Sequence, residues 1–310
     1  MKNYLFIRNL FDAPKNYYNS IVLNFFGLQV IRYLFHNMIH FIIKQIKYSL
    51  NEKNKEILDL KNNGITVIEN CFEENEFNLV KKIFEKEIIK VNKLVNKDNS
   101  GIDWSILTFD SETENSDLQE VYETIFNNKK IKKIISNALK IKDLGKPMIG
   151  FQMLENPISN EDNKDIQLAL HSDRFYPCYK LYLSIDDNNI ENGAYRYSRK
   201  SHKFSLKRVA HEYEYSIRNS LFNSGFDLKN NVEFSRCVPN KNIFSLLYKN
   251  TESIVTKKNS VVISNNKGFH SRGKMNKGSK RKQIRIVYYY LQRSMFYDFL
   301  KKIYNSYFKN

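Results

Sequence analysis

The 310-residue sequence has few of the residues that interrupt or cross-link a polypeptide chain. It contains only 10 glycines and 5 prolines, which leaves little room for low-complexity linkers. Its 3 cysteines, Cys71, Cys178 and Cys237, are odd in number and widely spaced, a pattern that fits neither a disulfide framework nor a zinc knuckle. We therefore expect a folded, cytoplasmic protein with one main domain and appendages.

Acidic residues are also scarce, with 33 Asp and Glu against 50 Lys and Arg, so that the formal net charge is +17. A strongly basic domain attracts phosphates without any sequence specificity. The lysines, however, are spread along the chain together with many Asn, Ile and Tyr, as an AT-rich coding bias would produce. No nucleic-acid-binding module is recognisable, and a nucleic-acid partner is therefore disfavoured.

The sequence lacks an uninterrupted apolar run of ~20 residues, the length that a membrane-spanning helix requires. The best candidate, residues 17–49, is interrupted by Arg32 and two histidines, and it lacks the small-residue cleavage site of a secretory signal. Apolar residues recur there at every fourth position, at Val22, Phe26, Val30, Leu34, Met38 and Ile42. Polar residues occupy another side, at Gln29, Arg32, His36, His40 and Lys47.

This periodicity predicts an amphipathic helix, or two in succession, within an N-terminal extension of residues 1–55. We expect its apolar side to pack against the main domain, residues 56–310. The alternative is a peripheral membrane contact in which the apolar side lies on a membrane surface, which the flanking Lys44 and Lys47 favour. His36 and His40 have the spacing of helical metal ligands, but no third ligand accompanies them, and we assign them to the polar face.

The pattern changes after Asn63. Residues 64–69 predict a strand, and a long amphipathic helix is expected to begin at Glu73 or Glu74 and to continue to Val91. Beyond residue 145 the chain contains short strand-like runs, at 147–154, 178–186, 194–197, 260–264 and 284–292. Helices followed by strands indicate an α+β domain or an all-β domain decorated with helices.

A candidate metal-binding pair lies in the stretch Ala169-Leu-His-Ser-Asp-Arg174. Side chains alternate along an extended strand, so His171 and Asp173 point the same way and could share one ion. Alone, the pair is weak evidence, because any histidine two residues before an aspartate satisfies the pattern.

Several motifs downstream occur in the order found in a known family. The run Leu181-Tyr-Leu-Ser-Ile-Asp-Asp-Asn-Asn-Ile-Glu-Asn-Gly-Ala, followed by Ser198-Arg-Lys-Ser-His-Lys, resembles the strand, Glu-Asn-Gly turn and Pro-Gly-Ser-His-Lys loop of the phytanoyl-CoA dioxygenase family. Residues 63–68 resemble the opening strand of that family, and residues 258–264 with Gly268-Phe-His270 resemble the strand before its distal histidine. The resemblance covers residues 60–292, with Arg199 and Lys200 in place of the Pro-Gly of the loop.

The resemblance implies a metal site and a co-substrate site. His171, Asp173 and His270 would form the facial triad that holds iron(II), leaving three positions open for 2-oxoglutarate and O2. Arg281, eleven residues after His270, stands where the family binds the far carboxylate of 2-oxoglutarate, and a planar guanidinium suits that role. Arg285 competes for this role because it lies on the same face of the same strand-like run.

The resemblance also implies the fold and the reaction. We expect a mainly β domain with flanking helices around a double-stranded β-helix, or jelly-roll, core. Tyr182 occupies the position of an aromatic residue near the co-substrate, and the implied activity is hydroxylation of a small molecule. Lys200 and Arg272 belong to basic loops expected at the mouth of the barrel, which favours an anionic substrate. The alternatives are a catalytically silent binding protein of this shape and a basic protein that contacts nucleic acid.

Overall fold

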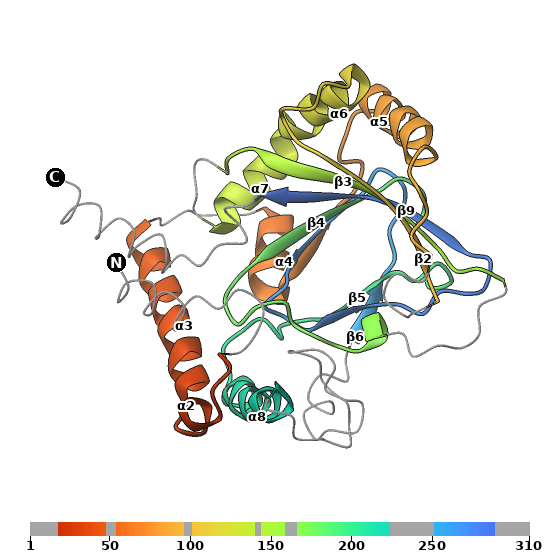
Figure 1. Cartoon of the computed structure of the whole chain (residues 1–310). Coiled ribbons are helices and arrows are strands. Elements are labelled where there is room, and N and C mark those ends of the chain that lie inside the picture. The colour runs from red at the N-terminus through yellow and green to blue at the C-terminus, as the bar shows by residue number, and fades with distance from the viewer. Residues whose placement is uncertain are drawn as a thin grey trace.

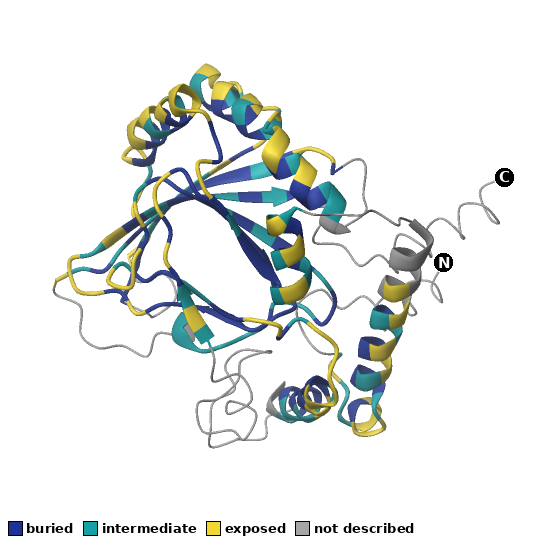
Figure 2. Ribbon diagram, turned by 180° about the vertical axis from the view of Figure 1, so that it is seen from behind, coloured by how far each residue is buried: buried dark blue, intermediate teal, exposed yellow. Residues whose placement is uncertain are grey.

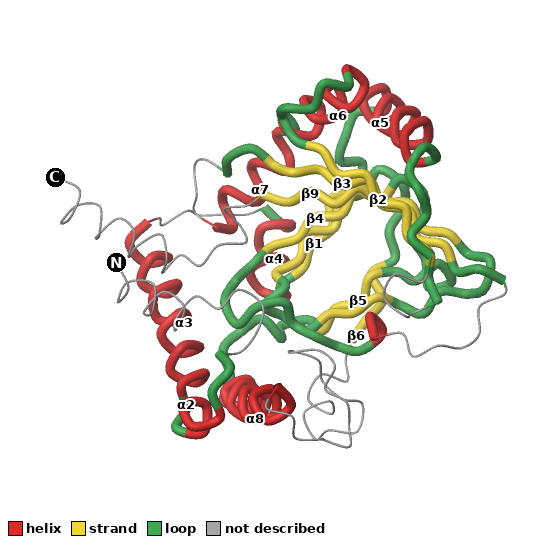
Figure 3. Tube along the Cα trace, viewed as in Figure 1, coloured by secondary structure: helices red, strands yellow, loops and turns green. Residues whose placement is uncertain are grey.

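Two antiparallel β-sheets face each other at the centre of the molecule (Figure 3). The computed structural model describes residues 18–47, 54–95, 101–139, 144–158, 166–223 and 251–288. The large sheet has the order β1 (Ile65–Ile68), β7 (Val261–Asn265), β4 (Tyr179–Ser184), β9 (Lys280–Tyr288), β3 (Pro147–Glu155), β2 (Asp103–Phe109). The small sheet has the order β6 (Thr251–Ile254), β5 (Tyr195–Ser198), β8 (His270–Arg272).

Helices cover the outer face of the large sheet (Figure 1). They are α4 (Lys55–Asn63), α5 (Glu74–Ile88), α6 (Ser116–Phe126) and α7 (Lys129–Leu139). Their apolar sides pack with outward-facing strand residues such as Leu181, Leu183 and Ile286 in the main hydrophobic core, and Figure 2 shows this buried layer in dark blue. Because side chains alternate along a strand, the residues between these core positions point to the opposite face, toward the small sheet.

The predicted fold class is confirmed: the protein is mainly antiparallel β-sheet with flanking helices, arranged as a jelly-roll core. The opening strand is β1, and the long helix after it is α5, which begins with a capping box formed by Glu73 and Glu76 and ends at Ile88. The strand-like runs beyond residue 145 correspond to β3, β4, β5, β7 and β9; the part of the last run after residue 288 lies outside the described residues. The sequence pattern missed β2, which pairs with β3 at the edge of the large sheet, and also β6 and β8, which pair with β5 in the small sheet.

The N-terminal region forms two helices in succession, α2 (Ile21–Phe25) and α3 (Leu28–Lys47), and both pack against α8 (Leu206–Asn223). The prediction that the apolar side packs inward is wrong. Phe26 is 77% exposed and Met38 is 50% exposed, whereas Gln29 and Arg32 are fully buried. The outward-facing apolar residues of these two helices are Val22, Leu23, Phe25, Phe26, Ile31, Leu34, Met38 and Phe41, named here the apolar stripe.

The inversion has a physical reason. The partner surface of α2 and α3 is itself polar, and Asn24 and Gln29 make buried hydrogen bonds to α8 that an apolar side chain could not make. His36, assigned to the polar side, is buried and stacks on the ring of Tyr176. The side chains of His40, Ile42 and Lys47 lie outside the described ones. No helix among the described residues is long and apolar enough to cross a membrane.

Candidate metal centre

His171, Asp173 and His270 meet at one point. One ligand atom from each residue lies within 4.8 Å of the ligand atoms of the other two, and Nε2 of His270 is 3.5 Å from Oδ2 of Asp173. Ligands in neighbouring positions around one octahedral ion are about 3 Å apart, because each metal–ligand bond is roughly 2.1 Å long. A small adjustment of side chains would therefore place all three around one ion. The residues fit a divalent metal.

Backbone hydrogen bonds fix the two segments that carry these residues. His171 and His270 each donate a backbone N–H to the carbonyl of the other, both at 2.9 Å, and their rings lie 4.5 Å apart. The backbone N–H of Asp173 donates to the carbonyl of Asn266, also at 2.9 Å. Residues almost one hundred positions apart are thus held in register before any ion binds.

The ring orientation of both histidines leaves the same nitrogen for the metal. Nδ1 of His171 lies 2.9 Å from the carbonyl of Ala169, and Nδ1 of His270 lies 3.0 Å from the carbonyl of Gly268. A neutral histidine that donates through Nδ1 presents Nε2 as the acceptor or ligand atom. Each carbonyl therefore selects the tautomer that an ion at the shared point requires.

The protonation states also suit a metal ligand set, which needs neutral imidazoles and an ionised carboxylate. Burial, with nearby His171 and Lys180, lowers the pKa of His270 to about 3, and burial likewise lowers the pKa of His171. Burial alone would raise the pKa of Asp173, but Lys180 and the two histidines outweigh it and hold that pKa well below its usual range. All three residues are in the binding form at neutral pH.

Two residues that the sequence analysis did not single out contact the carboxylate of Asp173. Nζ of Lys180 and Nδ2 of Asn266 lie 2.8 Å from Oδ2 of Asp173, and Nδ2 of Asn266 is also 2.9 Å from Nε2 of His270. Burial opposes the charge on Lys180, but Asp173 more than compensates and raises the pKa of the amine above its ordinary value. Alternation along β4 could have identified Lys180, which lies two residues before Tyr182 and points to the same face.

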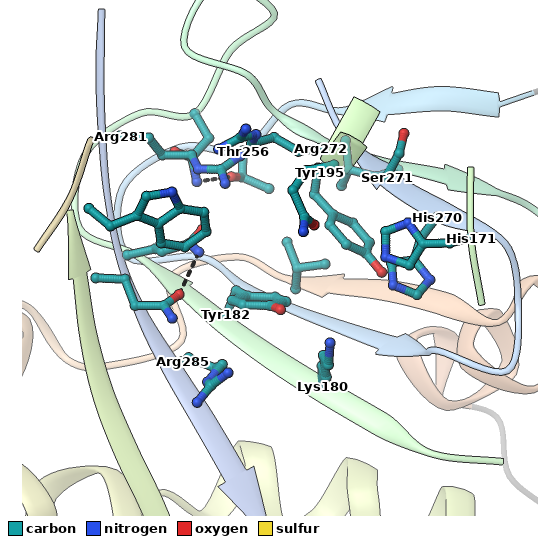
Figure 4. Close-up of a pocket in the computed structure, with 17 residues that line it drawn as sticks. His171, Lys180, Tyr182, Tyr195, Thr256, His270, Ser271, Arg272, Arg281 and Arg285 are labelled. Atoms are coloured by element: carbon teal, nitrogen blue, oxygen red, sulfur yellow. Dashed lines mark hydrogen bonds between the residues drawn. The ribbon is translucent and has the colours of Figure 1, made fainter. Parts of the chain in front are cut away.

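The metal-binding point borders a cavity of about 210 Å³ between the two sheets. Figure 4 shows His171 and His270 at one end of this cavity and Arg281 and Arg285 at the other, with Tyr182 between them. Lys180 and Arg272 also line it, and none of the described lining residues carries a carboxylate. The cavity is therefore strongly cationic, which favours anionic ligands.

Both candidate co-substrate arginines line this cavity, but their environments differ. Arg281 is 7% exposed and donates from Nη1 to the carbonyl of Gly193, the glycine of the Glu-Asn-Gly turn. Burial and the neighbouring Arg272 lower the pKa of Arg281 to about 10, so it stays charged at neutral pH. Arg285 is only half-buried and lies directly opposite Tyr182 in the pairing of β9 with β4.

The basic residues expected at the barrel mouth do not all line the same cavity. Arg272 lines the cavity, and its guanidinium lies over the ring of Trp104, 5.6 Å from the centroid. Lys200 is not among the described residues that line this cavity, and Lys203 lines a separate cavity next to α3 and α4. Lys200 adopts a φ of 66°, so the position that carries Pro-Gly in the resembling family keeps an unusual backbone conformation here despite its side chain.

Tyr195 is a further cavity residue that the motif comparison overlooked. Its ring lies 5.6 Å from the ring of His270 and 5.9 Å from that of Tyr182, and its hydroxyl is 3.1 Å from the hydroxyl of Ser264. The two tyrosines form an aromatic wall beside the metal-binding point. Tyr195 follows the Glu-Asn-Gly turn directly, so its place in β5 was expected but its contact with the histidine was not.

Comparison with known proteins supports the fold. No family model and no curated protein matches the sequence. Among solved structures, the chain is similar to the epimerase SnoN in complex with Fe3+, alpha ketoglutarate and nogalamycin RO, with a TM-score of 0.50, 10% identity, and coverage of 75% of this chain and 81% of that one.

A prolyl-4-hydroxylase from Pseudomonas putida gives a TM-score of 0.43 at 10% identity and covers 74% of this chain and 95% of that one. At such identities the likeness concerns the fold alone. That fold is shared with SnoN.

Proposed function

We propose that the protein is an iron(II)- and 2-oxoglutarate-dependent oxygenase of the phytanoyl-CoA dioxygenase type that hydroxylates a small anionic molecule. One observation carries the proposal: His171, Asp173 and His270 converge, in the correct protonation states, at the end of a cationic cavity. The ordered motifs of the sequence and the jelly-roll core support the same conclusion independently. Together, bound iron(II), 2-oxoglutarate and O2 would supply the oxidising power, with succinate and CO2 as the products of the co-substrate.

The residues around the cavity have distinct roles in this proposal. The two imidazoles and the carboxylate of Asp173 hold the metal on one side, which leaves the cavity side open to ligands. Arg281 binds the far carboxylate of 2-oxoglutarate through its planar guanidinium, and the wall formed by Tyr182 and Tyr195 limits access of water to that carboxylate. Asn266 orients the carboxylate of Asp173 by its hydrogen bond.

The charge of the cavity supports an anionic substrate. Asp173 offsets Lys180, and 2-oxoglutarate would offset the two charges of the metal ion. Three arginine charges then remain in a largely buried space, where an unneutralised cation is unfavourable. Arg285 has no hydrogen-bond or ion-pair partner among the described residues, and it is the cation best placed to bind a carboxylate or phosphate group of the substrate.

The size of the cavity limits the substrate. Its volume of about 210 Å³ is below the usual range of ligand pockets, which begins near 300 Å³. A small metabolite with one or two acidic groups fits this combination of volume and charge.

The direct test is turnover of 2-oxoglutarate. Purified protein, reconstituted anaerobically with iron(II) and then exposed to O2, is expected to release succinate, and protein treated with a chelator is expected to release none. Variants in which His270 or Asp173 is replaced by alanine serve as controls for adventitious iron. Iron-loaded protein that binds 2-oxoglutarate without forming succinate, even with a panel of small acids, would contradict the enzymatic role and favour a binding protein.

We also propose that the apolar stripe contacts a membrane surface. The apolar stripe of α2 and α3 is exposed, and the net charge of +17 complements anionic lipids. The enzyme would then be cytoplasmic with a peripheral membrane contact.

A further inference from the structure

A buried ion pair lies directly behind the metal centre, on α8. Arg208 and Glu212, one helical turn apart, are both 0% exposed, and Nη2 and Nε of Arg208 lie 2.9 and 3.0 Å from Oε1 of Glu212. Such a pair is rarely a source of stability, because the loss of hydration of two charges offsets their attraction. The other bonds of this pair indicate what it does.

Arg208 joins the two segments that carry the metal ligands. Its Nη2 donates to the hydroxyl of Ser172, at 2.9 Å, and Ser172 lies between His171 and Asp173 in the sequence. Its Nη1 donates to the carbonyl of Lys267, at 2.8 Å, and Lys267 follows Asn266 in the turn before His270. One guanidinium therefore bridges both segments from the side opposite the cavity.

Glu212 is held in turn by the N-terminal helix α3. Nε2 of Gln29 donates to Oε2 of Glu212 at 2.7 Å, and Nη1 of Arg32 donates to Oε1 of Gln29 at 2.8 Å. The guanidinium of Arg32 lies 4.7 Å from the centroid of the Phe175 ring, two residues after Asp173. All of these polar side chains are fully buried.

A second contact from α3 reaches the other ligand segment. Nζ of Lys267 donates to Oδ1 of Asn37 at 2.5 Å, and it lies 5.0 Å from the centroid of the Tyr33 ring. The buried face of α3 thus contacts the chain on both sides of the metal centre. Burial of this series of polar groups costs free energy, which a helix that only covered the domain could avoid with apolar side chains.

From this geometry, and resting on the proposed function, we infer that Arg208, fixed by Glu212 and Gln29, is a positioning residue that sets the spacing of the two metal-binding segments. The helix α3 is therefore an integral part of the metal centre. Groups that orient metal ligands from outside are known to affect affinity strongly, by about 10- to 100-fold on mutation. Here the orienting group is the guanidinium of Arg208, which contacts the carbonyl of Lys267 and the hydroxyl of Ser172 and does not itself contact the imidazoles.

The experiment must separate positioning from folding, because deleting Arg208 alone would leave Glu212 buried without its partner. The double variant Arg208→Met with Glu212→Leu avoids this problem, since apolar residues of similar volume often replace a buried pair without loss of stability. The same helix provides a matched control: Arg218 and Glu214 form an ion pair of 2.7 Å with the same spacing, but their side chains are 38% and 29% exposed. The control variant is Arg218→Met with Glu214→Leu.

The readouts are the dissociation constant and absorption spectrum of bound Co(II), together with the unfolding midpoint of the metal-free protein. We expect the buried double variant to unfold near the wild-type temperature but to bind Co(II) about 10- to 100-fold more weakly, with a changed ligand-field spectrum. The exposed control should bind within about twofold of wild type. Ser172→Ala, which keeps the ion pair and removes only one bridge, should weaken binding by about tenfold.

Two results would overturn the inference. The first is a stable double variant, or a Ser172→Ala protein, that binds Co(II) with the wild-type constant and spectrum; Ser172→Ala decides the matter if the double variant does not fold. The second is equal weakening in the exposed control. If the wild-type protein itself binds no divalent cation, the proposed function fails together with the inference. If the wild-type protein binds Co(II) but the variants give one of the two results above, the inference alone fails.

Discussion

Replacing Arg281 and Arg285 separately is expected to distinguish binding of the co-substrate from binding of the substrate. Arg281→Ala removes a charge-assisted, two-pronged contact with the far carboxylate of 2-oxoglutarate, an interaction worth about 1.5–3 kcal/mol. At ~1.4 kcal/mol per tenfold change, the apparent KM for 2-oxoglutarate should rise by about one to two orders of magnitude. The metal dissociation constant should not change, because Arg281 lies at the end of the cavity away from the histidines.

Succinate release without added substrate is the appropriate assay, because it reports on the co-substrate independently of the unknown substrate. Arg285→Ala is the matched control: it removes the same group from the same face of β9, and it should leave this KM nearly unchanged. Unfolding midpoints must accompany the kinetics, since Arg281 also binds the carbonyl of Gly193. If Arg285→Ala raises the KM and Arg281→Ala does not, the spacing from His270 has selected the wrong arginine.

Four further outcomes are expected. Because the pKa of His270 is about 3, protons should hardly compete with the metal between about pH 7.5 and pH 5. A site with an ordinary histidine would lose affinity for the metal below about pH 6.5. Measuring the dissociation constant of Co(II) as a function of pH checks this. In the metal-free protein the fold is expected to lose stability as the pH falls from about 6.5 toward 3, because the unfolded chain binds a proton there that the buried His270 does not; urea unfolding at several pH values checks this. Asp173→Ala should abolish tight metal binding while circular dichroism shows an intact fold, and loss of the fold would indicate a structural role for the pair with Lys180. Phe26→Ser should weaken binding to anionic vesicles, measured by sedimentation, by about tenfold, because it removes an apolar contact worth ~1.5 kcal/mol. Ile89→Ser changes an equally exposed residue on another face and should have no effect. Equal behaviour of the two variants would exclude the apolar stripe as the membrane contact.

The convergence of the three candidate metal ligands was predictable because the geometry within each of the two segments is local. Alternation along an extended chain places His171 and Asp173 on one side, and the motif order supplied His270. Alternation places Lys180 on the cavity face, but its contact with Asp173 and that of Asn266 were not visible in the sequence, because both depend on which neighbouring strand or turn approaches the carboxylate. Sequence spacing alone contains no information on that approach.

The orientation of the N-terminal helices was the principal error, and its cause is general. Hydrophobic periodicity identifies an amphipathic helix, but the inference that the apolar side faces inward assumes an apolar partner surface. Here the partner, α8, presents the fully buried Glu212, which Gln29 matches with a hydrogen bond. The polarity of that surface arises from the ion pair with Arg208 and could be recognised only after α8 was placed behind the metal centre.

The cation-rich cavity has a consequence for the resting protein. Positive groups enclosed together at low dielectric are poorly hydrated and repel one another; burial first, and Arg272 second, lower the pKa of Arg281. The ligand-free protein therefore retains an electrostatic strain that any suitable anion relieves. If the proposed function holds, stability and activity oppose each other at this site. Substitutions that neutralise an arginine would then yield a more stable but less active protein, and phosphate or sulfate in a purification buffer would stabilise the fold while competing with 2-oxoglutarate.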